Sequence, residues 1–231
     1  MLRPFFLLCA LLWPALAIAG LEEALTAYRK GNFKAAAKEF QILAKQGNTR
    51  AQYNLGVMYD HGQGVPQSQK TAAEWYRKAA EQGNANAQIN LGVMYDLGQG
   101  VEQDFAQAVK WYRKSAEQGN ANAQYNLGVM YDLGQGTPQD YKAAAEWYQK
   151  AAEQGNANAQ INIGVMYIKS QGVHQDYVQA HRWLSLAAAS GERDAIEFRD
   201  LLAAEMTAGQ IGEAQRLARE WSDQHHAKGK P

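Results

Sequence analysis

The chain has 231 residues, of which 23 are basic (Lys or Arg) and 23 are acidic (Asp or Glu), so its formal net charge is zero. This balance argues against nucleic acid or an acidic membrane surface as the main partner, because both attract strongly basic proteins. The one cysteine, Cys9, excludes a fold held together by disulfides.

The first 19 residues have the pattern of a secretory signal peptide. Arg3 provides a basic start, residues 5–17 form an apolar run, and the small residues Ala17 and Ala19 mark a cleavage site. The run is shorter than the ~20 residues that a membrane-spanning helix needs. We therefore expect residues 1–19 to be removed on export. The mature chain is expected to be periplasmic or secreted, with no integral membrane span.

The rest of the chain repeats itself with a period of 36 residues. Tryptophan marks the same place in four successive units, at Trp75, Trp111, Trp147 and Trp183. A fixed period of this size is typical of repeat architectures. The units follow one another without a gap, as residues 48–83, 84–119, 120–155 and 156–191.

Each unit has the sequence pattern of two helices. In the second unit, one helical face is expected to hold Ala87, Leu91, Met94 and Tyr95, and another to hold Ala108, Trp111, Tyr112 and Ser115. The second pattern places the tryptophans in the core. The second helices are expected to begin at the caps Ser68, Asp104, Asp140 and Asp176, with Gln107 and Gln179 completing capping boxes. They are expected to end at the C′ glycines Gly83, Gly119, Gly155 and Gly191.

The flanking segments differ from the four units. Residues 20–47 are a weaker copy and are predicted to form an N-terminal capping hairpin with a tetratricopeptide-like turn. Residues 192–223 are predicted to form C-terminal capping helices, the second of which begins at a capping box from Thr207 to Gln210. Residues 224–231 lack an apolar period and are predicted to form a frayed tail.

The repeated segments carry a family resemblance. Residues 51–59 (Ala-Gln-Tyr-Asn-Leu-Gly-Val-Met-Tyr), 62–65 (Gly-Gln-Gly-Val) and 72–83, which contain Trp75 and Gly83, resemble Sel1-like repeats, relatives of the tetratricopeptide repeat. The resemblance implies an all-α fold: an α-solenoid, a right-handed superhelix of stacked helical hairpins, that serves as a scaffold for protein–protein contacts. A cysteine-rich branch of this family joins its hairpins by disulfides, but the repeats here contain no cysteine. Activities of that branch therefore transfer weakly to this chain.

Motifs that would indicate catalysis are missing from the sequence. It has no Ser-x-x-Lys, Gly-x-Ser-x-Gly, His-Glu-x-x-His or phosphate-binding Gly-x-x-x-x-Gly-Lys segment. We therefore expect no catalytic residues, no cofactor and no metal site, including at the adjacent His225 and His226 of the tail. The isolated residues His61, His174 and His181 are expected to be surface or turn residues.

A partner-binding groove is expected along the first helices. Alignment with the related tetratricopeptide repeat places the groove positions at Tyr53, Val57 and Asp60; Ile89, Val93 and Asp96; Tyr125, Val129 and Asp132; and Ile161, Val165 and Ile168. This stripe is apolar and aromatic with an acidic margin, and it lacks the basic residues that would bind a peptide carboxylate. The repeated residues Asn54, Asn90, Asn126 and Asn162 either bond to a neighbouring backbone or contact a ligand.

The function predicted from these features is that of an exported scaffold or adaptor with no catalysis of its own, whose partner is a protein or peptide. Two alternatives remain open at the level of sequence. One is a hydrolase directed at the cell wall or at β-lactams, by analogy with the cysteine-rich branch. The other is a secreted effector that binds host proteins.

Overall fold

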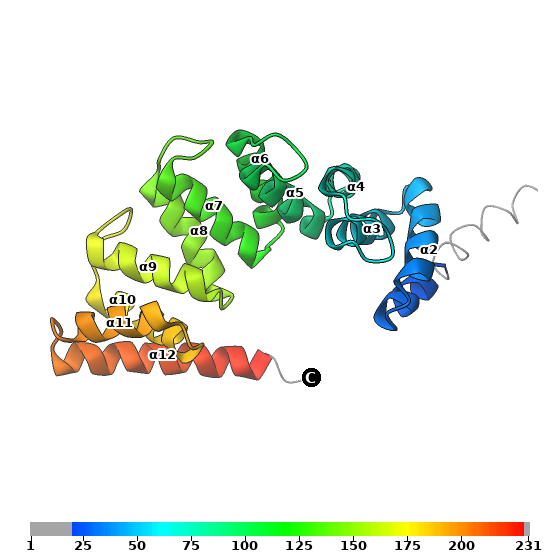
Figure 1. Cartoon of the computed structure of the whole chain (residues 1–231). Helices are drawn as coiled ribbons and strands as arrows, with labels where there is room; N and C mark the ends of the chain where they lie inside the picture. Colours follow the sequence, from blue (N-terminus) through cyan, green and yellow to red (C-terminus); the bar gives the residue numbers. More distant parts are fainter. Residues whose placement is uncertain (1–19, 229–231) are drawn as a thin grey trace, which may run out of the picture. The chain divides into compact units, whose positions relative to one another are not determined.

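A computed structural model describes residues 20–228, and side chains as far as His225. All regular elements in this range are α-helices (Figure 1). A helix over residues 20–29 is followed by α2 (Phe33–Lys45), α3 (Thr49–His61), α4 (Gln69–Glu81), α5 (Ala85–Leu97), α6 (Phe105–Glu117), α7 (Ala121–Leu133), α8 (Tyr141–Glu153), α9 (Ala157–Lys169), α10 (Tyr177–Ala189), α11 (Arg193–Ala203) and α12 (Ala208–Lys228). None of the described helices is long and apolar enough to cross a membrane. The predicted signal peptide, residues 1–19, lies outside the described residues.

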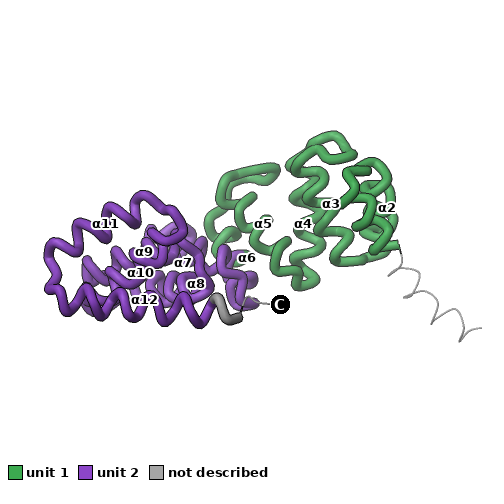
Figure 2. Tube along the Cα trace, turned by 90° about the horizontal axis from the view of Figure 1, so that it is seen from below, with its two compact units in different colours: residues 1–111 green, residues 112–231 purple. Residues whose placement is uncertain are grey.

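The described chain forms two compact units, coloured separately in Figure 2. Unit 1 ends at Trp111 and unit 2 begins at Tyr112, so the boundary falls within α6. In unit 1, successive helices from α2 to α5 pack against one another as antiparallel neighbours. In unit 2, α8 packs between α7 and α9, and α10 contacts α9, α11 and α12. The all-α repeat architecture predicted from the sequence is therefore present in each unit.

The helix ends confirm most of the predicted caps. The Asp140 carboxylate accepts a hydrogen bond from the Ala143 amide at 3.0 Å, and Asp176 accepts one from Gln179. Gln179 does not complete a capping box, because its side-chain oxygen instead accepts a bond from Arg182 at 3.1 Å. The first helices have asparagine caps that the sequence analysis did not assign: Asn48, Asn84, Asn120 and Asn156.

The turns that end in Gln-Gly bring successive repeats into close backbone contact. Gly172 has a φ of 70°, and a Cβ at this position would lie 2.1 Å from the carbonyl oxygen of Tyr141 at the start of α8. Gly64 and Gly100 approach the preceding second helix in the same way in unit 1. Only glycine meets both demands, since it tolerates positive φ and has no side chain to clash.

Buried glutamines join each first helix to the helix before it. The side-chain amides of Gln88 and Gln160 donate to the carbonyl oxygens of Ala80 and Ala152 at 3.0 and 3.1 Å. These carbonyls lie in the last turn of a helix and also accept hydrogen bonds from the amides of Gly83 and Gly155, both at 3.0 Å. Gln52 and Gln124 make the same contact in their repeats. The glutamines thus connect each first helix to the end of the preceding helix through a second hydrogen bond to the same carbonyl oxygen.

The four repeated tryptophans do not share one environment. Trp111 and Trp183 are buried, with exposed fractions of 5% and 0%. Trp75 and Trp147 are only half-buried, and the ammonium groups of Lys78 and Lys150 lie 4.1 Å from their ring centres. The prediction of a core role is therefore wrong for these two, because the fully buried ring in each of their helices is the next residue, Tyr76 or Tyr148.

The C-terminal region also departs from the prediction. Helix α12 continues to Lys228, whereas a frayed tail was expected from residue 224. The reason is a packing contact: the His225 ring stacks on Trp221 with a centroid distance of 3.6 Å, and the Trp221 ring meets Trp183 of α10 edge to face. The last residues, 229–231, lie outside the described part of the chain.

Candidate functional site

The predicted groove positions lie on the first helices of the repeats, at intervals of four and three residues. This spacing places the three members of each set on one face of α3, α5, α7 and α9. Every one of them is half-buried, neither enclosed in the core nor fully exposed. The sets on α3 and α5 belong to unit 1, and those on α7 and α9 belong to unit 2.

The inner side of this face rests on the core tyrosines. The Tyr53 ring lies 6.0 Å from the Tyr76 ring, and the Tyr125 ring lies 5.9 Å from Tyr148, each pair with an interplanar angle of 37°. Val57 and Val129 pack against the same clusters. Burial raises the pKa of the Tyr53 and Tyr125 hydroxyls. Both rings are therefore held in place on one side and open on the other.

The acidic margin contacts the hydroxyl ends of the core tyrosines. The Tyr148 hydroxyl donates to the Asp132 carboxylate over 3.4 Å. Burial raises the pKa of Tyr76 and Tyr148 well above that of a free tyrosine, and the nearby carboxylates of Asp60 and Asp132 raise it further. A tyrosine with a raised pKa stays protonated at neutral pH. The Tyr148 hydroxyl is then a hydrogen-bond donor, whereas the buried Tyr76 hydroxyl has no hydrogen-bond partner among the described residues.

The repeated asparagines take part in the same contacts. Asn90 and Asn162 lie near the hydroxyls of Tyr76 and Tyr148 in the preceding repeat, and they partly offset the rise in the pKa of these tyrosines. Asn54 instead donates to the carbonyl oxygen of Arg50 within its own helix, at 2.8 Å. The Asn54 bond is structural, and it is made within its own helix and not to the neighbouring helix backbone that the sequence analysis considered.

The histidines fall into different environments. His61 and His174 are exposed, as expected, but His181 is only 3% exposed, so its assignment to the surface or a turn is wrong. Both ring nitrogens of His225 face carbonyl oxygens, those of Trp221 at 2.8 Å and Glu153 at 2.7 Å. Among residues with described side chains, no group of three or more metal-binding side chains comes together.

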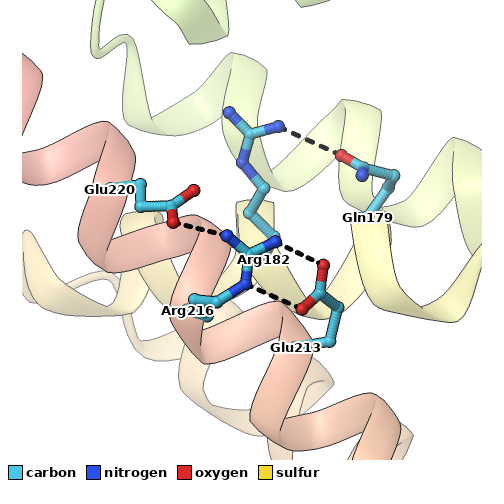
Figure 3. A network of polar contacts seen from close by, with 5 residues as sticks. All are labelled: Gln179, Arg182, Glu213, Arg216 and Glu220. Carbon is cyan, nitrogen blue, oxygen red and sulfur yellow. Dashed lines mark hydrogen bonds and ion pairs between the residues drawn. The ribbon is translucent and has the colours of Figure 1, made fainter.

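The C-terminal cap carries polar contacts that the sequence analysis missed. On one side of α10 and α12, Arg182 bonds to Gln179 while Arg216 bridges Glu213 and Glu220 (Figure 3). Between α10, α11 and α12 lies a cavity of about 550 Å³, lined in part by His181, Ser185 and Arg199. One signal in the sequence could have indicated it, because the residues equivalent to His181 in the other units are Ala73, Val109 and Ala145.

The comparisons with known proteins agree with this architecture. The Sel1 repeat family model matches residues 49–84, 85–120, 121–156 and 157–192, one residue later than the units delimited from the sequence. No functionally curated protein matches the chain.

Solved structures resemble the chain over most of its length. A Sel1 repeat protein from Oxalobacter formigenes is 34% identical, with a TM-score of 0.75 over 88% of this chain and 84% of the other. The protective antigen c5321 of uropathogenic Escherichia coli is also 34% identical, with a TM-score of 0.59 over 92% of this chain. This chain spans 55% of the antigen's length. A Sel1 repeat protein described as putative, from Klebsiella pneumoniae, shares the fold at 22% identity and a TM-score of 0.50, over 81% of this chain and 93% of the other.

Proposed function

Because the chain belongs to the Sel1 repeat family, whose members generally mediate protein interactions without catalysis, we propose that it is an exported scaffold that binds a protein or peptide partner through its groove positions. The site is the face of α3 and α5 in unit 1 and of α7 and α9 in unit 2. The N-terminal sequence pattern supports export, and the half-buried stripe supports binding.

The observation that carries the proposal is the combination of apolar character and partial exposure in every repeat. Ile89, Val93 and Val129 remain accessible although neighbouring positions on the same helices are completely buried. Rigid tyrosines at two of the positions fit a binding role, since aromatic residues are enriched at interfaces and lose little conformational entropy there. Half-buried aspartates at the margin disfavour a strongly acidic partner.

The contact surface can be mapped by site-specific photo-crosslinking in cells. A photoreactive amino acid would replace Tyr53, Val93 or Tyr125, and, as matched controls, the exposed Glu74 and Glu146 on the second helices. We expect the three groove positions to give the same crosslinked partner and the two controls to give none of it. Equal crosslinking from the controls, or none from the groove, would reject this surface.

The chain itself offers mild substitutions for testing the contribution of the tyrosines. Isoleucine occupies the equivalent positions 89 and 161, so Tyr53→Ile and Tyr125→Ile should preserve the fold. Aromatic anchors often contribute about 2 kcal/mol each at an interface. The double variant should therefore bind the crosslinked partner at least about tenfold more weakly, as measured by calorimetry. Unchanged affinity in a folded double variant would exclude the tyrosines as anchors.

Export has a separate test. N-terminal sequencing of the protein released by osmotic shock should find a mature chain beginning at Gly20. A cytosolic product that retains Met1 would contradict the proposed export without bearing on the binding surface.

The location of the crosslinked partner distinguishes an envelope scaffold from an effector, since an effector would crosslink to a host protein. A β-lactam reporter and a muropeptide mixture should remain unhydrolysed.

A further inference from the structure

The cavity in the C-terminal cap is the part of the described chain that the proposed scaffold function does not use. It lies between α10, α11 and α12, within unit 2, and has a volume of about 550 Å³. Pockets that hold small organic ligands typically measure roughly 300–1,000 Å³. The size is therefore adequate for a molecule as large as a short peptide.

The floor of the cavity contains a buried polar side chain at a position that is otherwise apolar. His181 lines the cavity and is 3% exposed, whereas the equivalent residues Ala73 and Ala145 are buried alanines. Burying an imidazole costs free energy unless its polar atoms are bonded. Nδ1 lies 3.2 Å from the Ser185 hydroxyl on the same helix, and Nε2 has no side-chain hydrogen-bond partner in the described part of the chain.

The rim of the cavity presents charges of both signs. Arg199 and Asp200 pair with each other, with an N–O distance of 2.7 Å, and so largely neutralise one another. Arg219 and Asp223, one turn apart on α12, form no ion pair within the described part of the chain. An unpaired guanidinium and an unpaired carboxylate at one mouth suit a ligand that carries a carboxylate and an ammonium group.

The remaining wall is mostly apolar, with Gln215 and Ser222 as its polar members. Leu186, Ile211 and Ala218 line the cavity from α10 and α12. We propose that this cavity binds a short apolar peptide with free termini, whose carboxylate meets Arg219, whose ammonium group meets Asp223 and whose backbone bonds to His181. The apolar side chains of the peptide would lie against the wall. This site is separate from the groove positions, so its existence does not depend on the proposed scaffold function.

The electrostatic setting of His181 is consistent with a neutral hydrogen-bonding group. Burial lowers the pKa of the imidazole, and the neighbouring Arg199 lowers it further, while Asp200 opposes the shift. At neutral pH the ring therefore carries one hydrogen, and Nε2 can accept or donate according to the tautomer. A peptide backbone supplies both donors and acceptors.

The peptide class can be tested by calorimetric titration of the full mature chain with the dipeptide Leu-Leu. The matched probes are N-acetyl-Leu-Leu, which lacks the ammonium group, and Leu-Leu amide, which lacks the carboxylate. We expect saturable binding of Leu-Leu and at least about tenfold weaker binding of each blocked form, since a charge-assisted hydrogen bond is lost in each. No binding of Leu-Leu at millimolar concentration, or equal binding of all three peptides, would overturn the proposal.

Three variants place the binding at this cavity. His181→Ala restores the residue found at positions 73 and 145, and Arg219→Gln changes an exposed residue, so both should fold. Each should weaken Leu-Leu binding about tenfold or more. Arg216→Gln on the same helix does not line the cavity and should leave the affinity unchanged. Wild-type affinity in both of the first two variants, or an equal loss in all three, would reject the site.

Discussion

The second helices of the third and fourth repeats, α8 and α10, occupy the same place in the 36-residue period but have different surroundings. In α8, Trp147 is half-buried and its ring is covered by Lys150. In α10, Trp183 is completely buried, with Trp221 of α12 at one edge and the Arg182 guanidinium 4.4 Å from its centre. The two tryptophans have the same register in sequence, so the register alone does not determine burial.

The difference shows what a capping element does to a repeat. Helix α10 contacts α9, α11 and α12, whereas α8 packs between the first helices α7 and α9. Trp221 of the extra helix covers Trp183, and this region encloses His181 where the third repeat has Ala145, although Trp111 of the second repeat is buried as well. The fourth repeat therefore combines higher local burial with a polar group that the internal repeats lack.

Truncation of the two tryptophans should give the largest contrast. Trp183→Ala removes a fully buried ring and should lower the free energy of unfolding by about 3–5 kcal/mol. Trp147→Ala should cost only about 1–2 kcal/mol, because part of the ring is already in contact with water. Urea unfolding followed by circular dichroism measures both. Equal losses would show that the two positions are energetically equivalent despite their different burial.

The joint between the third and fourth repeats should be the next most sensitive place. Gly172→Ala forces a Cβ against the Tyr141 carbonyl and also strains a positive φ, so we expect a loss of about 2–4 kcal/mol. Gly191→Ala, just after α10, also places alanine at a positive φ, but no atom lies within 4 Å of the new Cβ. This variant should lower the free energy of unfolding by only about 1–2 kcal/mol. Thermal unfolding compares them, and a larger loss for Gly191 would contradict the close approach.

A smaller effect should appear as a dependence on pH. Because the pKa of His181 is lowered in the folded state, its neutral form is favoured by folding, and stability is lost as the pH falls below the unfolded value of about 6.5. His181→Ala should therefore lose less of its melting temperature than the wild type between about pH 7 and about pH 5. The exposed His174→Ala serves as the control and should follow the wild type. If the melting temperature of His181→Ala fell with pH as much as that of the wild type, the burial of His181 would not be the cause of the pH dependence.

Much of the local structure followed from the sequence. The period, the aspartate caps, the C′ glycines and the Thr207–Gln210 capping box are present in the structure. These features depend on contacts within about four residues, or on the φ preference of one glycine. The lengths of α2 to α10 follow for the same reason, since these helices end at a glycine or serine of positive φ or at the residue before one.

The two candidate sites also differ in how far the sequence predicts them. The groove positions could be named from the sequence because they recur in every repeat, and the structure gives all of them partial exposure, although whether they bind a partner stays a prediction. The cavity of the C-terminal cap could not be derived, because its walls come from three helices with no repeated counterpart. The only local sign was a histidine in place of the alanine or valine of the other units.

The sequence by itself determined that this protein is an all-α stack of four Sel1 repeats with capped helices, because periodicity and cap chemistry act over short stretches of chain. Only the tertiary structure decided which tryptophans are buried, that α12 continues past residue 224, and that His181 lines a cavity. Each of these depends on what lies against a side chain from a helix far away in sequence. The burial of a side chain depends on the helix that packs against it, so identical residues at identical positions of the repeat can differ in burial.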